Sequence, residues 1–313
     1  MAMMNILVTG GAGFVGSYLC RLLLNEGHSV TAVDDLSNGK RANIVDGINF
    51  IEADITSADL PRKLVDLNFD VVIHCAAQSS NAISFRDPKQ DMMTNQLGTL
   101  NVLDLCLDKK VKHCVFTSSM SVYGQPKSLP TKESENCLPD SFYAAHKLAS
   151  EHYLRMYAEQ HGLKYTIFRL YTTYGHGQSL ENKDQGLLSI YLSYIVNKEK
   201  LIVKGSKDRT RDIVHVDDVA KAIILSLKNP AAFGKIYNLG TGKSIKIREI
   251  VELLTTGMGY RKDEYTVSYE GTTPGDPFDT LANIQAAKRD LGWEPKIFAE
   301  EGIRLTLAGL KNQ

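Results

Sequence analysis

The fold is decided by the stretch Asn5-Ile6-Leu7-Val8-Thr9-Gly10-Gly11-Ala12-Gly13-Phe14-Val15-Gly16. Its first five residues are an apolar run typical of a buried parallel strand. A helical pattern follows over 17–25 and ends at Gly27. Glycines between a strand and a helix permit a tight turn, a close backbone approach to a pyrophosphate, and a helix N-terminus that faces its charge. The stretch therefore predicts a dinucleotide site lined by Gly10, Gly13, Phe14, Val15 and Gly16.

Two acidic residues end the second expected strand, which covers 28–33. A carboxylate about 20 positions beyond the glycines holds the adenosine ribose hydroxyls in such sites, and it repels a 2′-phosphate. NAD is therefore favoured over NADP. Asp34 is the better candidate because it directly ends the strand, whereas Asp35 reads as a loop residue. Asn38 lies in the turn that follows and is included among the cofactor-binding residues.

Strand and helix patterns alternate along the first half of the chain. This spacing predicts an α/β fold with a doubly wound parallel sheet of the Rossmann type. Small residues end the fourth strand, and Cys75, Ala76 and Ala77 leave room there for a cofactor. The expected strands are 5–9, 28–33, 49–53, 70–77, 112–119 and 164–170.

Three more positions are expected at the cofactor. Asp54 and Ile55 follow the third strand, and Asp54 is placed to reach the adenine. A cap for a helix over 57–67 is an equally good reading of Asp54. Asn95 is expected to open a helix over 98–107.

Composition sets limits on partners and compartment. The chain has 313 residues, 43% hydrophobic and 23% charged, as in an ordinary globular protein. Lys plus Arg and Asp plus Glu both number 36, so no global field attracts nucleic acid or an anionic membrane. The apolar runs are far shorter than a membrane span. Five scattered cysteines predict reduced thiols in a cytoplasmic protein, with no disulfide frame and no metal site.

A second decisive stretch is Tyr143-Ala144-Ala145-His146-Lys147. It begins a helical pattern over 143–159, in which residues four apart project from one face. An ammonium beside a phenol favours the phenolate, so we predict that Lys147 lowers the pKa of Tyr143 toward neutrality. A phenolate can take a proton from a sugar hydroxyl. By itself the spacing is far more often that of a half-buried Tyr and a solvated Lys.

Six motifs follow one another from Asn5 to about Leu291, nearly the whole chain. They occupy 9–16, 74–78, 118–124, 143–147, 211–219 and 274–276. Each is modest, but in this order they resemble the extended short-chain dehydrogenase/reductase family, that is, its nucleotide-sugar epimerases and dehydratases. The general likeness is to the UDP-glucose 4-epimerases.

The resemblance implies roles for individual residues. Tyr143 matches the catalytic base and Lys147 its partner, which also holds the nicotinamide ribose. Ser119 matches the hydroxyl that binds the reacting sugar oxygen, with Asn95 in support, and Tyr171 lies near the nicotinamide. Arg211 pairs with the substrate diphosphate, and the implied substrate-binding set is Ser79, Ser119, Ser121, Thr172, Ser189, Arg211 and Asp276.

Several positions depart from the family pattern. Thr172 replaces an Asn that touches substrate, and Thr273 replaces an Arg, so one diphosphate contact is missing or is supplied elsewhere. Family 4,6-dehydratases have an Asp-Glu pair after the catalytic Ser, and 3,5-epimerases have a Cys there. Met120 and Ser121 stand in these places and can serve as neither acid nor base.

We therefore predict an NAD-binding Rossmann domain over 1–170, partly completed by 205–240, and a mainly substrate-binding region over 171–313. The predicted activity is NAD-dependent epimerisation of a nucleotide-diphosphate sugar through a 4-keto intermediate. A 4-dehydrogenase that releases the keto sugar uses the same residues, and a non-catalytic dinucleotide-binding regulator is a third alternative. The family commonly forms homodimers through the helices that begin here near Gly98 and Tyr143.

Overall fold

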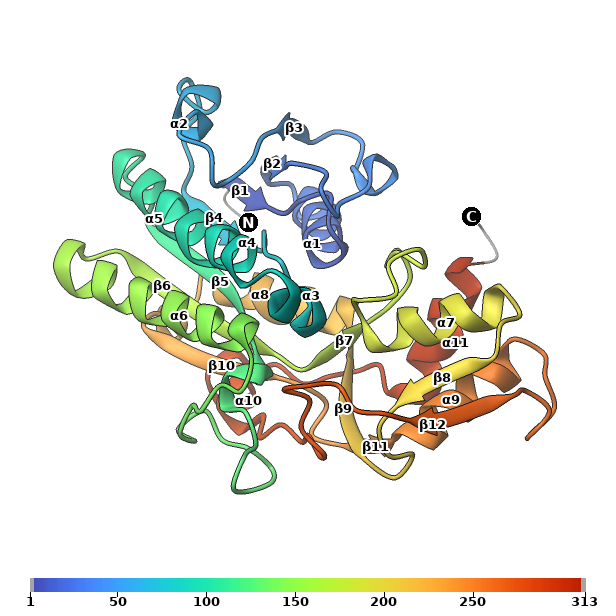
Figure 1. Ribbon diagram of the computed structural model, residues 1–313. Coiled ribbons are helices and arrows are strands. Elements are labelled where there is room, and N and C mark those ends of the chain that lie inside the picture. The colour runs from blue at the N-terminus through green and yellow to red at the C-terminus, as the bar shows by residue number, and fades with distance from the viewer. Residues whose placement is uncertain (1–2, 311–313) are drawn as a thin grey trace.

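The computed structural model describes residues 3–310. Its centre is a parallel sheet in the order β10-β6-β5-β4-β1-β2-β3. The chain starts in the middle of this sheet, runs outward to β3, and returns to build the other half from β4 (Figure 1). The strands are β1 (Asn5–Thr9), β2 (Ser29–Asp34), β3 (Asn49–Glu52), β4 (Val71–His74), β5 (His113–Ser119), β6 (Lys164–Leu170) and β10 (Lys235–Leu239).

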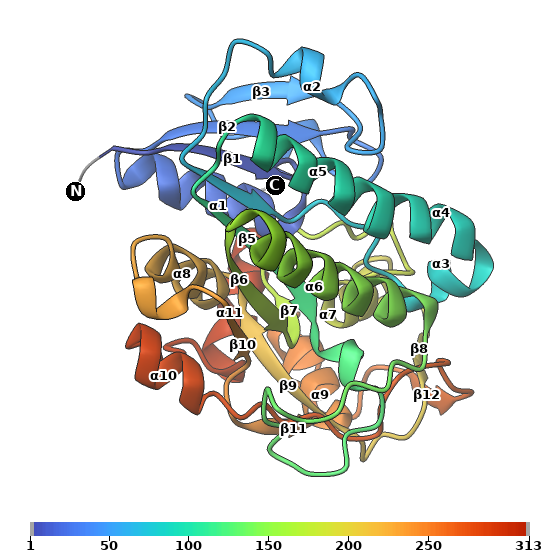
Figure 2. The same ribbon diagram turned by 90° about the vertical axis from the view of Figure 1, so that its left-hand side faces the viewer.

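Helices cover both faces of the sheet (Figure 2). On one face lie α5 (Gly98–Asp108) and α6 (Phe142–His161), and on the other α1 (Phe14–Asn25), α8 (Val216–Ser226) and α10 (Gln285–Leu291). Two apolar cores result, one centred on α1 and α8 and one beneath α5 and α6. This is the doubly wound α/β fold, so the predicted fold class is confirmed.

A smaller region adjoins the carboxyl ends of the central strands (Figure 1). Two small sheets and three helices surround their own core, in which Tyr174 is fully buried. One sheet joins β7 (Thr172–Tyr174), β9 (Thr210–His215) and β11 (Ser244–Lys246), and the other β8 (Leu201–Lys204) and β12 (Val267–Glu270). The helices are α7 (Leu187–Val196), α9 (Ile247–Gly257) and α11 (Ala299–Leu310). Of the segment 205–240, therefore, β10 joins the central sheet and β9 does not.

The expected helix over 57–67 is wrong in length. Only α2 (Leu60–Lys63) is helical, between turns on either side. Leu60 and Leu64 are buried, whereas Val65 is 65% exposed. So short a segment has too little apolar packing to hold a longer helix.

Asn95 does not open a helix. Asp87 caps α4 (Pro88–Met92) by accepting a hydrogen bond from Gln90 N at 2.9 Å, and the chain continues through a π turn, Met93–Leu97, into α5. The true start was readable from Asp87 and the following Pro88, a favoured first helical residue. Asn95 lies inside the π turn, a feature frequent at functional sites.

The remaining elements are short. Residues 81–86 form α3 (Asn81–Arg86), and three 3₁₀ turns cover Arg41–Asn43, Met120–Tyr123 and Pro230–Ala232. Within residues 3–310, no helix combines the length and apolar character needed to cross a bilayer.

Candidate active site

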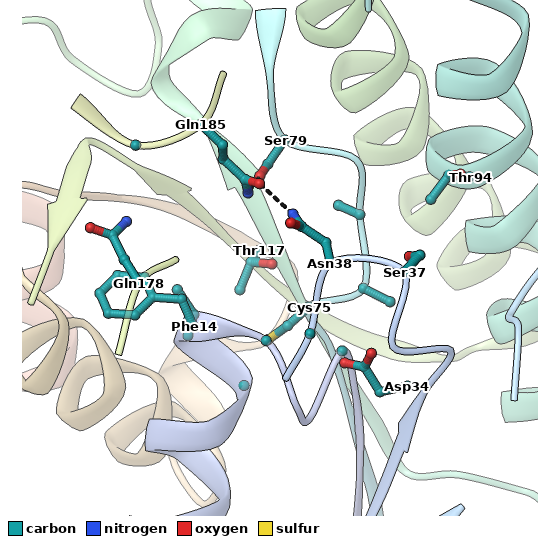
Figure 3. Close-up of a pocket in the computed structure, with 18 of the residues that line it drawn as sticks. Phe14, Asp34, Ser37, Asn38, Cys75, Ser79, Thr94, Thr117, Gln178 and Gln185 are labelled. Atoms are coloured by element: carbon teal, nitrogen blue, oxygen red, sulfur yellow. Dashed lines mark hydrogen bonds between the residues drawn. The ribbon is translucent and has the colours of Figure 1, made fainter. Parts of the chain in front are cut away.

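A cleft of about 320 Å³ opens at the carboxyl ends of the central strands, where the smaller region meets the sheet (Figure 3). Ligands bind at this edge in open α/β sheets because the loops there can diverge. Most of the sequence-predicted site residues line it. They are Gly10, Gly13, Phe14, Val15, Gly16, Asp34, Asn38, Asp54, Ile55, Cys75, Ala76, Ala77, Ser79, Ser119, Tyr143, Lys147 and Tyr171.

The glycine turn leaves no room for side chains. A Cβ on Gly16 would lie 2.0 Å from Gly10 O, and one on Gly10, whose φ is +71°, would lie 2.8 Å from Ala76 Cα. The bare backbone of this turn faces the cleft at the N-terminus of α1, where the helix dipole favours an anion. This cradle fits the pyrophosphate of a dinucleotide.

Asp34 fixes the geometry of the turn. Its Oδ2 accepts a hydrogen bond from Ala12 N at 3.0 Å and its Oδ1 accepts one from Leu36 N at 2.9 Å. Each oxygen retains a second acceptor site for a ligand hydroxyl. Burial raises the pKa of Asp34, while these backbone donors oppose the rise. Asp35 instead accepts hydrogen bonds from Ser37 in an exposed loop.

Asp54 is not a helix cap, because α2 begins only at Leu60 and Asp59 precedes it; its place at the adenine stays a prediction. It lines the cleft, and its carboxylate accepts hydrogen bonds from the backbone N and hydroxyl of Thr56, at 2.7 Å each. Cys75, which follows β4, also lines the cleft and stays a thiol, because burial raises its pKa to about 12. At the end of β4, Cys75, Ala76 and Ala77 thus give the cleft a wall of small, uncharged side chains.

A segment that sequence reasoning missed crosses the cleft. Asn38 Nδ2 donates to Gln185 Oε1, Gln185 Nε2 donates to Ser79 Oγ, and Asn182 Nδ2 lies 3.2 Å from Asn38 Oδ1. These side chains converge from three separate loops (Figure 3). Gly177 and Gly186 are typical of a loop, but no local sequence pattern indicates that this loop returns over the cleft. Its lining residues are Gly177, Gln178, Ser179, Asn182, Gln185 and Gly186.

The sequence-predicted catalytic residues lie in one wall of the cleft. Ser141 caps α6 by accepting a hydrogen bond from Ala144 N at 3.2 Å, which places Tyr143 and Lys147 on the first turns. Lys147 Nζ donates to Thr117 O at 2.8 Å. Ser119 ends β5, and its hydroxyl donates to Ser121 Oγ at 3.1 Å. The two segments are brought together because α6 packs on β5.

The predicted lowering of the Tyr143 pKa is wrong for this structure. Burial raises it to about 12, and the hydrogen bond with Ser119 opposes that rise only in part. Burial also lowers the pKa of Lys147 to about 8. The ammonium lies over the Phe116 ring, 4.5 Å from its centroid, and bonds to Thr117 O, so desolvation dominates both groups.

Six predicted site residues lie outside the cleft wall. Asn95 Nδ2 donates a hydrogen bond to Gln78 O at 2.9 Å. The Ser121 hydroxyl accepts a hydrogen bond from the Ser119 hydroxyl. Ser189 donates its hydroxyl to Gln185 O and Gly186 O, at 2.9 and 3.0 Å. Thr172 begins β7, but its neighbour Thr173 is the residue that faces the cleft. The other two are Arg211 and Asp276, which form an ion pair at 2.6 Å.

The family model for the NAD dependent epimerase/dehydratase family matches residues 6–240. The chain belongs to this family. It is 34% identical to a UDP-glucose 4-epimerase of Mycolicibacterium smegmatis, with 99% of each chain covered.

Two solved structures extend the likeness over nearly the full length. One is a UDP-glucose 4-epimerase with UDP-glucose from Thermotoga maritima, with TM-score 0.93, 36% identity and 99% of each chain covered. The other is a UDP-glucose 4-epimerase from Thermus thermophilus in complex with NAD, with TM-score 0.91, 33% identity, and 98% and 99% covered. The predicted family, the NAD cofactor and an epimerase-type enzyme are confirmed, and the dehydrogenase alternative has no comparable support.

Proposed function

We propose that this enzyme interconverts two UDP-hexoses that differ in configuration at C4, through a 4-keto sugar. The observation that carries the proposal is the wall that Ser119, Tyr143 and Lys147 form beside the glycine cradle. A base, a hydroxyl donor and a dinucleotide site then meet in one cleft. The relatives' UDP-sugars favour uridine as the nucleotide.

Tyr143 is proposed to accept the proton of the sugar C4 hydroxyl and to return it. Bound NAD would supply the hydride acceptor and donor for C4, and positive charge that favours the phenolate form of Tyr143. Ser119 holds the reacting oxygen through its hydroxyl. Lys147 would hold the nicotinamide ribose and add positive charge to the site.

Cofactor contacts follow the cleft wall. The turn formed by Gly10, Gly13 and Gly16 would hold the pyrophosphate, and Asp34 the adenosine ribose hydroxyls. The buried ring of Tyr171, 3% exposed, would lie beside the nicotinamide. Arg211 and Asp276 are proposed on the substrate side, where the guanidinium suits a diphosphate.

The test is a product analysis with single UDP-sugars. UDP-glucose, UDP-galactose, UDP-glucuronic acid and UDP-N-acetylglucosamine are each incubated with the NAD-loaded enzyme and followed by NMR. Appearance of the C4 epimer without net NADH supports the proposal. Stoichiometric NADH with a keto sugar would make the enzyme a 4-dehydrogenase, and binding without conversion would leave a regulator.

We further propose that the enzyme works as a cytoplasmic homodimer through the outer faces of α5 and α6. Large apolar side chains are exposed on α6 and next to it, with Met92 at 42%, Phe142 at 44% and Met156 at 51%. Apolar surface of this kind marks interaction sites. Light scattering should give twice the chain mass, and Met156→Glu should weaken the association.

A further inference from the structure

Two arginines and one carboxylate form a buried cluster in the smaller region. Arg209 and Arg211 are 6% and 4% exposed, and both pair with Asp276, Arg211 through Nη2 to Oδ1 at 2.6 Å and Arg209 through Nη1 to Oδ2. The adjacent Asp279 is engaged elsewhere, since its carboxylate accepts hydrogen bonds from the backbone and hydroxyl of Thr210. Two guanidinium charges therefore share the carboxylate of Asp276.

An excess of buried positive charge is unfavourable unless an anion balances it. The Arg211 pKa reflects the imbalance: burial lowers it, Asp276 opposes this, and the charge of Arg209 lowers it further. Guanidinium groups stay charged at any physiological pH, so the cluster cannot relieve the imbalance by losing a proton. A bound anion would balance the excess positive charge.

Two polar atoms beside the cluster have no hydrogen-bond partner within residues 3–310, namely Arg209 Nε and the hydroxyl of Tyr191. Tyr191 is 3% exposed, and burial raises its pKa to about 12, while the charge of Arg209 and a hydrogen-bond interaction with its side chain oppose the rise, so the hydroxyl lies next to that guanidinium. Buried donors without partners are costly. They offer two hydrogen bonds to an oxygen-rich anion.

The cluster lies next to the catalytic helix. Gly275 packs against the N-cap of α6, since a Cβ on it would lie 3.0 Å from Ser141 Cβ, and Asn81 Nδ2 donates to Gly275 O at 3.4 Å. Ser141 precedes Tyr143 by two residues. The Asp276 carboxylate is 24% exposed, so water reaches the cluster from this side.

We infer that Arg209 is a second arginine for the substrate diphosphate, with the Tyr191 hydroxyl as an added donor. The inference rests on the proposed function and extends it, because it names residues outside the predicted set. A phosphate oxygen would replace the Asp276 carboxylate as the hydrogen-bond acceptor of the Arg209 guanidinium. The released carboxylate oxygen could then accept a hydrogen bond from a ligand hydroxyl. Arg209 would thus supply a charge that Thr273 cannot.

The test compares Arg209→Gln and Arg209→Lys with wild type, all loaded with NAD, by calorimetric titration with UDP. Arg209→Gln should weaken UDP binding about 10- to 100-fold, as expected for a charged hydrogen bond, and leave NAD binding unchanged. Arg209→Lys keeps the charge but loses the planar fork, so it should weaken binding about tenfold. If Arg209→Gln fails to fold, the Lys variant decides. Wild-type affinity in a folded variant would overturn the inference and leave Arg209 as a structural partner of Asp276.

Arg248→Gln is the matched control. Arg248 is 44% exposed and pairs with Asp208 at 2.8 Å on the surface near the same strand, so its loss should change UDP affinity by less than twofold. An equal loss in the control would show a general charge effect and overturn the inference.

Inorganic pyrophosphate separates this inference from the proposed function. It should raise the melting temperature of wild type more than that of Arg209→Gln, whatever nucleotide the enzyme uses. If wild type binds no UDP but this difference remains, the UDP assignment fails and the anion site stands. Equal shifts in the two proteins would overturn the anion site.

Discussion

The glycine cradle in the cleft and the charged cluster proposed for the substrate are built in different ways. On the cofactor side, contiguous motifs at the ends of β1, β2 and β4 present backbone and small side chains. On the proposed substrate side, which lies outside the cleft wall, Arg211 and Asp276 stand 65 residues apart in the sequence and meet only through the fold. One side excludes side chains, whereas the other is made of charged ones.

The difference has a consequence for specificity. A cradle of backbone amides is indifferent to most substitutions nearby but cannot accept a Cβ at Gly16. A cluster of charged side chains can be rewritten by single substitutions. The cofactor should therefore be the fixed property of this cleft, and the substrate the adjustable one.

The largest effect is expected where the two sides meet. Tyr143→Phe removes the proton acceptor and keeps the ring, so kcat should fall by about 10²- to 10⁴-fold. NAD and UDP should bind as before, because neither side of the cleft is otherwise changed. Single-turnover kinetics and calorimetry measure the two properties separately. Full activity in Tyr143→Phe would remove the proposed mechanism and leave a dinucleotide-binding fold.

The second effect concerns the buried lysine. The folded-state pKa of Lys147 is lowered from 10.5 to about 8, so between these values the folded protein binds fewer protons than the unfolded chain. Stability contributed by this group must then rise with pH across that window, by about 3 kcal/mol in total. In NAD-free protein, Lys147→Met should be more stable than wild type at pH 7, and the difference should shrink as pH approaches 10.5. Urea unfolding at several pH values checks this, and a constant difference would contradict it.

Sequence reasoning found the residues that line the cleft where their placement is set locally. The glycine turn, Asp34 and the Tyr143–Lys147 spacing are each read within a few residues, because a strand end or one helical turn fixes their geometry. It missed contacts that depend on the long-range return of the chain. Gln185 meets Asn38 from 147 residues away, and Arg209 meets Asp276 across 67. It also failed on the Tyr143 pKa, because burial cannot be read from spacing.

The third effect tests the substrate side alone. Arg211→Ala removes a buried charged donor, and the proposed diphosphate contact predicts an increase in KM of about 30-fold with little change in NAD affinity. Steady-state kinetics and NADH fluorescence titration provide the two readouts. Equal loss of both affinities would mean that Arg211 supports the fold through Asp276.

The smallest effect tests the cofactor side alone. Asp34 is 7% exposed and accepts hydrogen bonds from Ala12 N and Leu36 N. Asp34→Asn keeps the size of the side chain and one acceptor oxygen but removes the charge. A neutral amide holds ribose hydroxyls less well, so NAD affinity should fall about tenfold. The amide also no longer repels a 2′-phosphate, so NADP affinity should rise. The ratio of NAD affinity to NADP affinity should therefore fall by more than tenfold.

Titration with both dinucleotides measures this ratio. Asp35→Asn is the control, since Asp35 accepts hydrogen bonds from Ser37 in an exposed loop. If wild type binds NADP as tightly as NAD, or if Asp35→Asn narrows the preference as much, Asp34 does not select the cofactor.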